Sequence, residues 1–468
     1  MDILLINGNR EKVPYPVPPI GLSLVASAAE KAGHQVTFLD LTFEHHPLKA
    51  IAKSLSKSFG CVGLSMRNLD NCDYARRVSF VSDFKAMVSA IRALTSVPIV
   101  LGGSALSVAP QALLQAVGAD LAVVGDGEEA FVDLLAVLAQ GGDPAAVQGV
   151  LVSSSVHQQV QPRFADLTTL PRARIGRWTR LKPYMATEGV YPVQSKRGCA
   201  LECVYCTYVN HEGKRYRLRN PEEVADEVAE VVADHGVRDF EFVDSTFNLP
   251  IRHAVETCRA LARRRSGARF VGSSINPTKV TQELADAMVS AGFVSVLCTA
   301  ESASDRALEG LRKGFTRAEV AETARVLGAA GLRTLWLFLI GGPGETPETV
   351  EETLSFIHGS LGKNDVAFIA RGIRVYPDTG MEAVALREGL IRSREDLIHP
   401  VFYMNPSLNK EWLESRLHEA SRRDGRIILS DTTQSPLLPL GMRILRLAGA
   451  KKPLWRFVPA MNRVLHAL

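Results

Sequence analysis

Three cysteines, Cys199, Cys203 and Cys206, lie within eight residues, directly after a strand-like run and Gly198. Three thiolates at this spacing can bind three irons of a cubane [4Fe-4S] cluster and leave the fourth iron open to a ligand from outside the protein. A zinc site needs a fourth protein ligand. His211 lies five residues further on, but no second Cys or His pair follows at zinc-finger spacing. The motif therefore favours an iron-sulfur cluster over zinc.

The elements that must position these cysteines form a regular alternation of strands and helices. Helical segments such as 221–235 and 347–358 separate six strand-like runs in this half of the chain. This alternation predicts a partial (β/α)6 barrel of the TIM type, whose functional groups lie at the carboxyl ends of the strands. The predicted strands are Tyr191–Lys196, Asp239–Val243, Arg269–Gly272, Ser295–Thr299, Thr334–Ile340 and Val366–Val375.

A first series of strands and helices precedes the barrel and predicts a doubly wound, Rossmann-like parallel sheet. Nearly every strand of this series ends in a polar or glycine-rich turn, and in a parallel sheet those turns line one crevice. Glycine lets the backbone approach a ligand closely, so the sequence predicts a flat edge that binds a large ligand. The predicted strands are Ile3–Ile6, Val36–Leu39, Cys61–Leu64, Pro98–Leu101 and Asp120–Val124.

Four regions follow from these patterns. We expect the parallel-sheet domain over residues 1–152, a proline-containing linker over 153–190, the barrel over 191–385 and a helical C-terminal region over 386–468. In the last region Phe402, Tyr403 and Met404 could cover the barrel mouth and select the substrate, or could be core residues.

Composition sets the broad class of the protein. A chain of 468 residues exceeds the size at which a single core stops growing. The net charge of +4, from 54 basic and 50 acidic residues, is too small to indicate a nucleic-acid partner. Seven cysteines, three of them clustered, are a poor disulfide framework, and we expect Cys61, Cys72, Cys258 and Cys298 to be buried small hydrophobes.

We expect a cytoplasmic protein, because the apolar run at the N-terminus lacks the basic flank of a signal peptide and no stretch is long enough to span a bilayer. The tail after Pro436 is basic and apolar, so it could lie on an anionic membrane face; a packed helix pair with solvated edges is the more ordinary interpretation. Its basic residues are Arg443, Arg446, Lys451, Lys452, Arg456 and Arg463.

The cysteine motif, with Tyr205 before its last cysteine, resembles that of the radical S-adenosylmethionine superfamily. The resemblance implies that S-adenosylmethionine binds the open iron and is cleaved by one electron to give a deoxyadenosyl radical. An external electron donor such as flavodoxin or ferredoxin is implied as well.

Further motifs along the barrel are similar to those of the same superfamily. The segments 239–248, 297–302, 339–346 and 376–379 resemble its second, fourth, fifth and sixth strands, and the joint match covers about 192–390. The resemblance implies contacts to S-adenosylmethionine from Tyr205, Asp244, Glu301, Ser302, Gly342 and Gly344.

The first domain resembles the cobalamin-binding domain that precedes some of these barrels, over about residues 2–137. The resemblance implies cobalamin contacts from Asn7, Gly8, Pro19, Gly21, Ser65, Arg67, Gly102, Gly103, Gly125, Gly127 and Glu128. The sequence has no Asp-x-His-x-x-Gly motif, so the lower face of cobalt would be open, bound to water or near a side chain such as Arg67.

Together these resemblances imply a radical S-adenosylmethionine enzyme that methylates an unactivated carbon of a small or lipid-like substrate with the help of cobalamin. The sequence identifies no catalytic acid or base. Cyclisation, oxidation or rearrangement with the same cofactors stays open, as does a barrel whose cobalamin domain has degenerated. A protein of another class, a non-catalytic corrinoid or redox sensor, is a less favoured alternative, because a sensor does not need a cluster iron that is open to an outside ligand. Arg217 and Arg219 could reach a carboxylate or a phosphate, but solvated charges beside a helix are the more ordinary interpretation.

Overall fold

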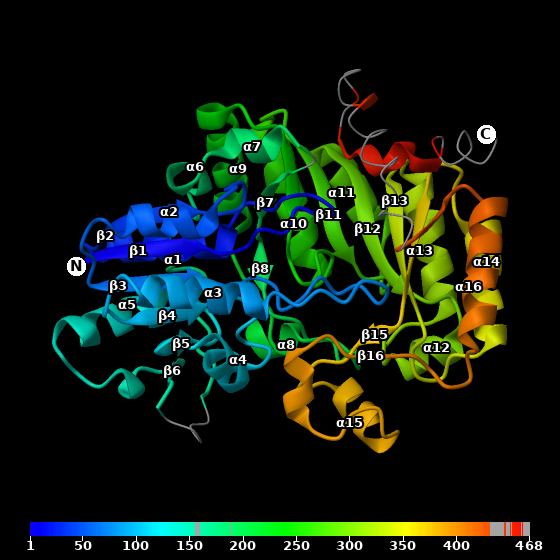
Figure 1. Ribbon diagram of the computed structural model, residues 1–468. Helices are drawn as coiled ribbons and strands as arrows, with labels where there is room; N and C mark the ends of the chain where they lie inside the picture. Colours follow the sequence, from blue (N-terminus) through cyan, green and yellow to red (C-terminus); the bar gives the residue numbers. More distant parts are fainter. Residues whose placement is uncertain are drawn as a thin grey trace.

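The computed structural model describes residues 1–154, 160–187, 189–430, 444–445, 450, 452–459 and 461. It contains two units built on parallel sheets, which lie side by side in Figure 1, the first in blue to cyan and the second in green to orange.

The first unit is a six-stranded sheet of order β2-β1-β3-β4-β5-β6, parallel except for β6, which runs antiparallel to β5. All five predicted strands are present, and the structure adds β6. The strands are β1 Asp2–Asn7, β2 Gln35–Asp40, β3 Cys61–Ser65, β4 Ile99–Gly102, β5 Leu121–Val123 and β6 Val150–Val152; the helices are α1 Ile20–Lys31, α2 Pro47–Ser54, α3 Val81–Arg92, α4 Pro110–Val117 and α5 Gly127–Ala139.

Helices cover both faces of this sheet because its strands are apolar on both sides. Leu4 and Ile6 of β1 belong to one core cluster, which includes residues of α2, α3 and α4. Ile3 and Leu5 point to the opposite face and join a cluster with residues of α1 and α5. The carboxyl edge of the sheet is thus held by cores on both sides.

The segment between the units packs onto the first one. It contains the short helices α6 (Ile175–Trp178) and α7 (Leu181–Met185). The Tyr184 hydroxyl donates to Asp40 Oδ2 at 2.7 Å, and the Trp178 indole N–H donates to Ser27 Oγ at 3.0 Å.

The second unit is a curved parallel sheet of seven strands, in the order β17-β14-β13-β12-β11-β10-β7. Six of them are the predicted barrel strands; β17 is an addition. The strands are β7 Tyr191–Val193, β10 Asp239–Phe242, β11 Arg269–Ile275, β12 Phe293–Glu301, β13 Arg333–Ile340, β14 Val366–Arg371 and β17 Ile427–Leu429.

Helices surround this sheet on its outer side (Figure 1). Local signals set their ends: before α9 the Asn220 side chain accepts the N–H of Glu222 at 2.9 Å, and after it Gly236 takes a left-handed φ of 65°. The helices are α8 Tyr208–His211, α9 Pro221–His235, α10 Ile251–Arg264, α11 Gln282–Ala291, α12 Asp305–Gly310, α13 Arg317–Ala329, α14 Pro347–Ser360, α15 Gly380–Arg387 and α16 Lys410–Arg423.

Two antiparallel pairs flank the barrel: β8 (Lys196–Arg197) with β9 (Arg217–Leu218), and β15 (Ile373–Arg374) with β16 (Phe402–Tyr403). The region after 386 contains helices as predicted, but also β16 and β17. Phe402 and Tyr403 are buried.

Among the remaining cysteines, Cys61, Cys258 and Cys298 are buried as expected, whereas the prediction for Cys72 is wrong because this residue is exposed on the loop after β3. Within the described ranges, no helix is long and apolar enough to cross a membrane.

Candidate functional site

A cavity of about 330 Å³ lies where the carboxyl edge of the first sheet faces the barrel. Its wall on the first unit comes from the turns after β1, β3, β4 and β5, and its opposite wall includes Pro192, Gln194, Tyr208 and Val243. All the predicted cobalamin-contact residues except Gly8 line this cavity. Gly8 instead lies against the Phe84 ring, and its N–H donates to the Ser65 carbonyl at 3.2 Å.

Two glycines of this edge are required by the backbone itself. Gly103 has a φ of 101°, and a Cβ there would lie 2.4 Å from the Met66 carbonyl oxygen. Gly125 has a φ of 90°, and a Cβ would lie 2.4 Å from the carbonyl oxygen of Arg163. Left-handed backbone and close contact together exclude any side chain at these positions.

The cavity wall fits a large, flat ligand rich in hydrogen-bond acceptors. A Cβ added at Gly21 or Gly102 would meet no atom within 4 Å, so these positions face open space. The buried Asn9 amide nitrogen has no hydrogen-bond partner among the described residues and is a free donor in this wall. Such donors suit the amide-bearing rim of a corrin. Arg67 lines the same wall, and burial lowers the pKa of its guanidinium.

Two of the predicted cobalamin contacts also have structural partners. The Asn7 amide donates to Asp40 Oδ1 at 2.9 Å and to Thr42 Oγ1 at 3.0 Å. Glu128 is buried at the start of α5 and forms an ion pair with Arg197 of the barrel unit. Their contacts to cobalamin stay a prediction.

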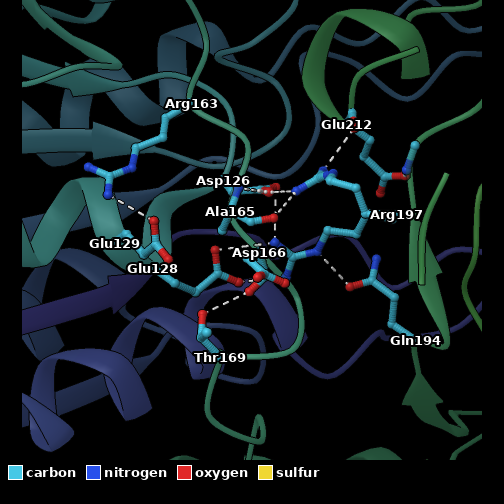
Figure 2. Close-up of polar contacts among 12 residues, drawn as sticks. Asp126, Glu128, Glu129, Arg163, Ala165, Asp166, Thr169, Gln194, Arg197 and Glu212 are labelled. Carbon is cyan, nitrogen blue, oxygen red and sulfur yellow. Dashed lines mark hydrogen bonds and ion pairs between the residues drawn. The ribbon is translucent and has the colours of Figure 1, made fainter. Parts of the chain in front are cut away.

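A buried ionic network joins the cavity wall to the cysteine loop (Figure 2). Arg197 Nη1 lies 2.9 Å from Asp126 Oδ1, and its Nη2 lies 2.5 Å from Glu128 Oε1. Burial alone would lower the pKa of Arg197, but the two carboxylates outweigh it and raise this pKa above its usual value. Arg217 forms an ion pair with the same Asp126. Arg219 likewise reaches a carboxylate, that of Glu227 at 2.5 Å.

The cysteine loop continues directly from Arg197. Gly198 donates its N–H to the buried Glu212 carboxylate at 3.1 Å, and the Cys199 N–H donates to the Gly213 carbonyl at 3.0 Å. Burial raises the pKa of Glu212 to about 7. The segment after α8 thus holds the start of the loop, through the Glu212 carboxylate and the Gly213 carbonyl.

Cys199 is buried, while Cys203 and Cys206 are partly exposed. Burial raises the pKa of Cys206 to about 12, and a metal ion binds the deprotonated form of such a thiol. Among the described residues, no three Cys, His, Asp or Glu side chains converge on a single metal ion.

Tyr205 and Glu301 meet beside the cysteine loop, although about a hundred residues separate them. The Tyr205 hydroxyl donates to Glu301 Oε1 at 2.8 Å. Sequence reasoning missed the third member, Lys313, whose Nζ lies 3.1 Å from the Tyr205 hydroxyl and 3.6 Å from Glu301 Oε1. Its context, Arg312-Lys313-Gly314, reads as an ordinary surface turn, yet Lys313 is 4% exposed. These polar groups could hold the amino and carboxylate ends of S-adenosylmethionine.

The other predicted S-adenosylmethionine residues are held by the protein itself. Asp244 is buried, accepts the N–H of Ser195 at 2.7 Å and pairs with Lys196 Nζ at 3.3 Å. Ser302 Oγ lies 3.1 Å from the Thr353 hydroxyl. Their contacts to S-adenosylmethionine, like those of Gly342 and Gly344, stay predictions.

Two family models match the chain, each within one of the two units. The B12 binding domain matches residues 6–135, and the Radical SAM superfamily matches residues 193–357. The prediction of a cobalamin-binding domain before a radical S-adenosylmethionine barrel is therefore confirmed.

Individual relatives and solved structures agree with these models. The chain is 27% identical to the tryptophan 2-C-methyltransferase of Streptomyces laurentii, over 81% of this chain and 73% of the relative. It is 28% identical to the anaerobic magnesium-protoporphyrin IX monomethyl ester cyclase of Rubrivivax gelatinosus, over 52% of this chain and 45% of the relative. The radical S-adenosylmethionine methyltransferase TsrM of Kitasatospora setae, solved with cobalamin and a [4Fe-4S] cluster, has the same fold (TM-score 0.86, 23% identity, covering 100% of this chain and 98% of that one).

The glycine-lined cavity, the three-cysteine loop at the barrel mouth and the two matching domain models agree with one another. The chain belongs to the radical S-adenosylmethionine enzymes that carry a cobalamin-binding domain.

Proposed function

We propose that this enzyme transfers a methyl group to a carbon atom of a small molecule. The observation that supports this most strongly is the shared cavity, whose walls come from the cobalamin-binding edge and from the barrel mouth beside the cysteine loop. The similarity to a tryptophan C-methyltransferase over most of both chains agrees with it.

The bound cofactors would supply a deoxyadenosyl radical and a methyl group, and the residues of the chain would bind, orient and exclude water. In this proposal Cys199, Cys203 and Cys206 hold the cluster. Tyr205 and Glu301, together with Lys313, hold S-adenosylmethionine beside it, and the glycine edge holds cobalamin.

The partners of the enzyme are part of the proposal. A one-electron donor such as a flavodoxin or ferredoxin reduces the cluster. Peripheral membrane contact through the C-terminal tail stays a prediction, because four of its six basic residues lie outside the described residues. Of the other two, Lys452 donates to the carbonyls of Met185 (3.1 Å) and Gly189 (2.6 Å).

The test is anaerobic purification of the full chain, reconstitution with iron, sulfide and hydroxocobalamin, and incubation with S-adenosylmethionine, a reductant and tryptophan as the first substrate. We expect cluster and corrin absorbance, and deoxyadenosine or S-adenosylhomocysteine as a product. Cys203→Ala should lose the cluster and all turnover, whereas Cys258→Ala, a buried cysteine outside the motif, should keep both.

Mass spectrometry of the products distinguishes the alternatives. A product heavier by one methylene group supports methyl transfer. Deoxyadenosine with a substrate that is altered but not methylated supports the cyclisation or oxidation alternative, which the similarity to the cyclase favours. A cluster without bound corrin would refute cobalamin-dependent methyl transfer.

A further inference from the structure

Glu241 is a buried carboxylate that faces the interior of the barrel. It lies on β10 between Phe240 and Phe242, and both rings belong to the core cluster formed with the surrounding helices. Successive side chains of a strand point to opposite faces, so Glu241 points away from the helices and into the barrel. Its residue is 9% exposed.

Among the described residues, no cation forms an ion pair with this carboxylate, and its hydrogen-bond donors are two hydroxyl groups. Tyr15, from the loop after β1 of the first unit, donates to Oε2 at 2.7 Å, and Ser273 of β11 donates to Oε1. Asp239, on the same face of the same strand, behaves differently: it forms an ion pair with Arg269 at 2.5 Å. Buried carboxylates are rare unless paired, so Glu241 is the exception on its own strand.

The barrel interior into which Glu241 points also carries apolar side chains. Trp336 and Phe338 of β13 pack outward into the helix-facing core, so their neighbours Leu335 and Leu337 point into the barrel, where they are partly exposed. Burial raises the pKa of Glu241, while the hydrogen bond from Ser273 and the charge of Arg67 oppose this rise. Glu241 is thus a buried acid without an ion pair among the described residues, on an inner barrel face that also bears Leu335 and Leu337.

The position of Glu241 connects it to the shared cavity. Val243, two residues further along the chain, lines that cavity, and Tyr15 comes from the unit that forms the cavity's other wall. A molecule held at Glu241 would therefore lie close to the wall of the shared cavity that Val243 lines.

We infer that Glu241 anchors the substrate, and that the substrate is a small molecule with an apolar body and a nitrogen-borne donor, an ammonium or ring N–H group. This inference rests on the proposed function and deepens it by naming the substrate class. Each carboxylate oxygen has a second lone pair to accept such a donor. A hydrogen bond to a charged group that replaces lost hydration is worth about 1.5–3 kcal/mol, or roughly 10- to 150-fold in affinity. A hydrocarbon lipid lacks the donor and would leave the acid unpaired.

Binding to the cluster- and cobalamin-loaded full chain, measured by isothermal titration with S-adenosylmethionine present, tests the inference. The probes are phenethylamine and tryptamine, each compared with its alcohol, 2-phenylethanol or tryptophol. We expect at least one amine to bind about tenfold or more tightly than its alcohol. Glu241→Gln should abolish this preference by weakening the amine alone, and Glu241→Asp should keep part of it.

Asp239→Asn is the matched control, because it removes an acid from the same face of the same strand; it should leave the amine preference unchanged. Equal affinity of amines and alcohols for the unaltered enzyme, or no binding of either amine, overturns the inference. Loss of corrin or cluster absorbance in Glu241→Gln also overturns it, since Glu241 would then serve a cofactor. Because binding needs no turnover, a protein that binds amines through Glu241 but methylates nothing refutes the proposed function alone.

Discussion

Glu345 closes the turn after β13 with a buried carboxylate. Its Oε2 accepts the N–H groups of Gly341 at 2.7 Å and Gly342 at 3.1 Å, while its Oε1 has no hydrogen-bond partner among the described residues. Burial raises its pKa from 4.5 to about 7, and the two backbone N–H groups only partly oppose this rise. The side chain therefore ionises in the folded protein at a higher pH than in the unfolded chain.

This shift predicts a pH dependence of stability. An acid whose pKa is raised by folding costs nothing below its unfolded pKa, and its penalty grows until pH passes the folded pKa. Between pH 4.5 and 7 the free energy of unfolding should fall by about 3 kcal/mol because of Glu345. Glu345→Gln, whose amide oxygen can accept the same two N–H groups, should remove this loss.

Urea unfolding of the apo protein at a series of pH values measures the difference between the two proteins. Glu352→Gln on the surface of α14 is the control and should follow the unaltered protein. Parallel pH profiles of the unaltered protein and Glu345→Gln would contradict the prediction.

Single residues differ in how well sequence alone identifies them. The three cysteines are found from spacing, since thiolates so close together indicate a metal site. Tyr205 and Glu301 are predicted from motifs, and the structure brings their side chains together. Lys313 escapes detection because a lysine in a turn is normally solvated, and only the fold shows that this one is buried against both.

At the scale of elements, two adjacent glycines at the end of β4, Gly102 and Gly103, have different roles. Substitutions at these positions can separate an effect on protein stability from an effect on cobalamin binding. Gly103→Ala places a Cβ against the Met66 backbone at a φ of 101°, so the free energy of unfolding should fall by about 1–3 kcal/mol. Gly102→Val projects into open space, so stability should change little while the side chain fills part of the corrin site.

Urea unfolding and corrin absorbance after gel filtration, measured on both variants, check this pair. We expect Gly102→Val to lose most of its bound cobalamin. Gly103→Ala should instead show the lower free energy of unfolding. Full cobalamin retention by Gly102→Val would place the corrin elsewhere.

The long alternation of strands and helices could be predicted because each element repeats its apolar pattern over several residues. The strands β6 and β17 were missed for a physical reason. Each has only three residues, too few to show a period, and each is a strand because a neighbour offers an open edge: β5 for β6 and β14 for β17.

At the scale of the whole molecule, a second buried ion pair locks the two units together. Arg374 Nε of β15 lies 2.7 Å from Asp70 Oδ2, on the loop after β3, and both side chains are at most 2% exposed. These residues are 304 positions apart, so no local pattern of sequence could reveal the pair.

Arg374→Met should leave Asp70 buried without its cation and cost about 3–5 kcal/mol of stability. Because the pair spans both units, we expect the unaltered chain to unfold in one calorimetric transition and that of Arg374→Met to broaden or split in two. Arg259→Met, which breaks a surface pair with Glu283 inside the barrel unit, should cost at most about 1 kcal/mol and leave one transition. An unsplit transition in Arg374→Met with unchanged stability would show that the pair does not hold the units.

The network around Arg197 has a consequence for protein engineering. Asp126 and Glu128 belong to the cobalamin-binding unit, whereas their cation lies two residues before the first cluster cysteine. A chimaera that grafts another corrinoid domain onto this barrel would bury the Arg197 guanidinium without its two ion-pair partners unless the graft carries both acids at the start of its last helix. The two units are therefore interchangeable between relatives only as a matched set.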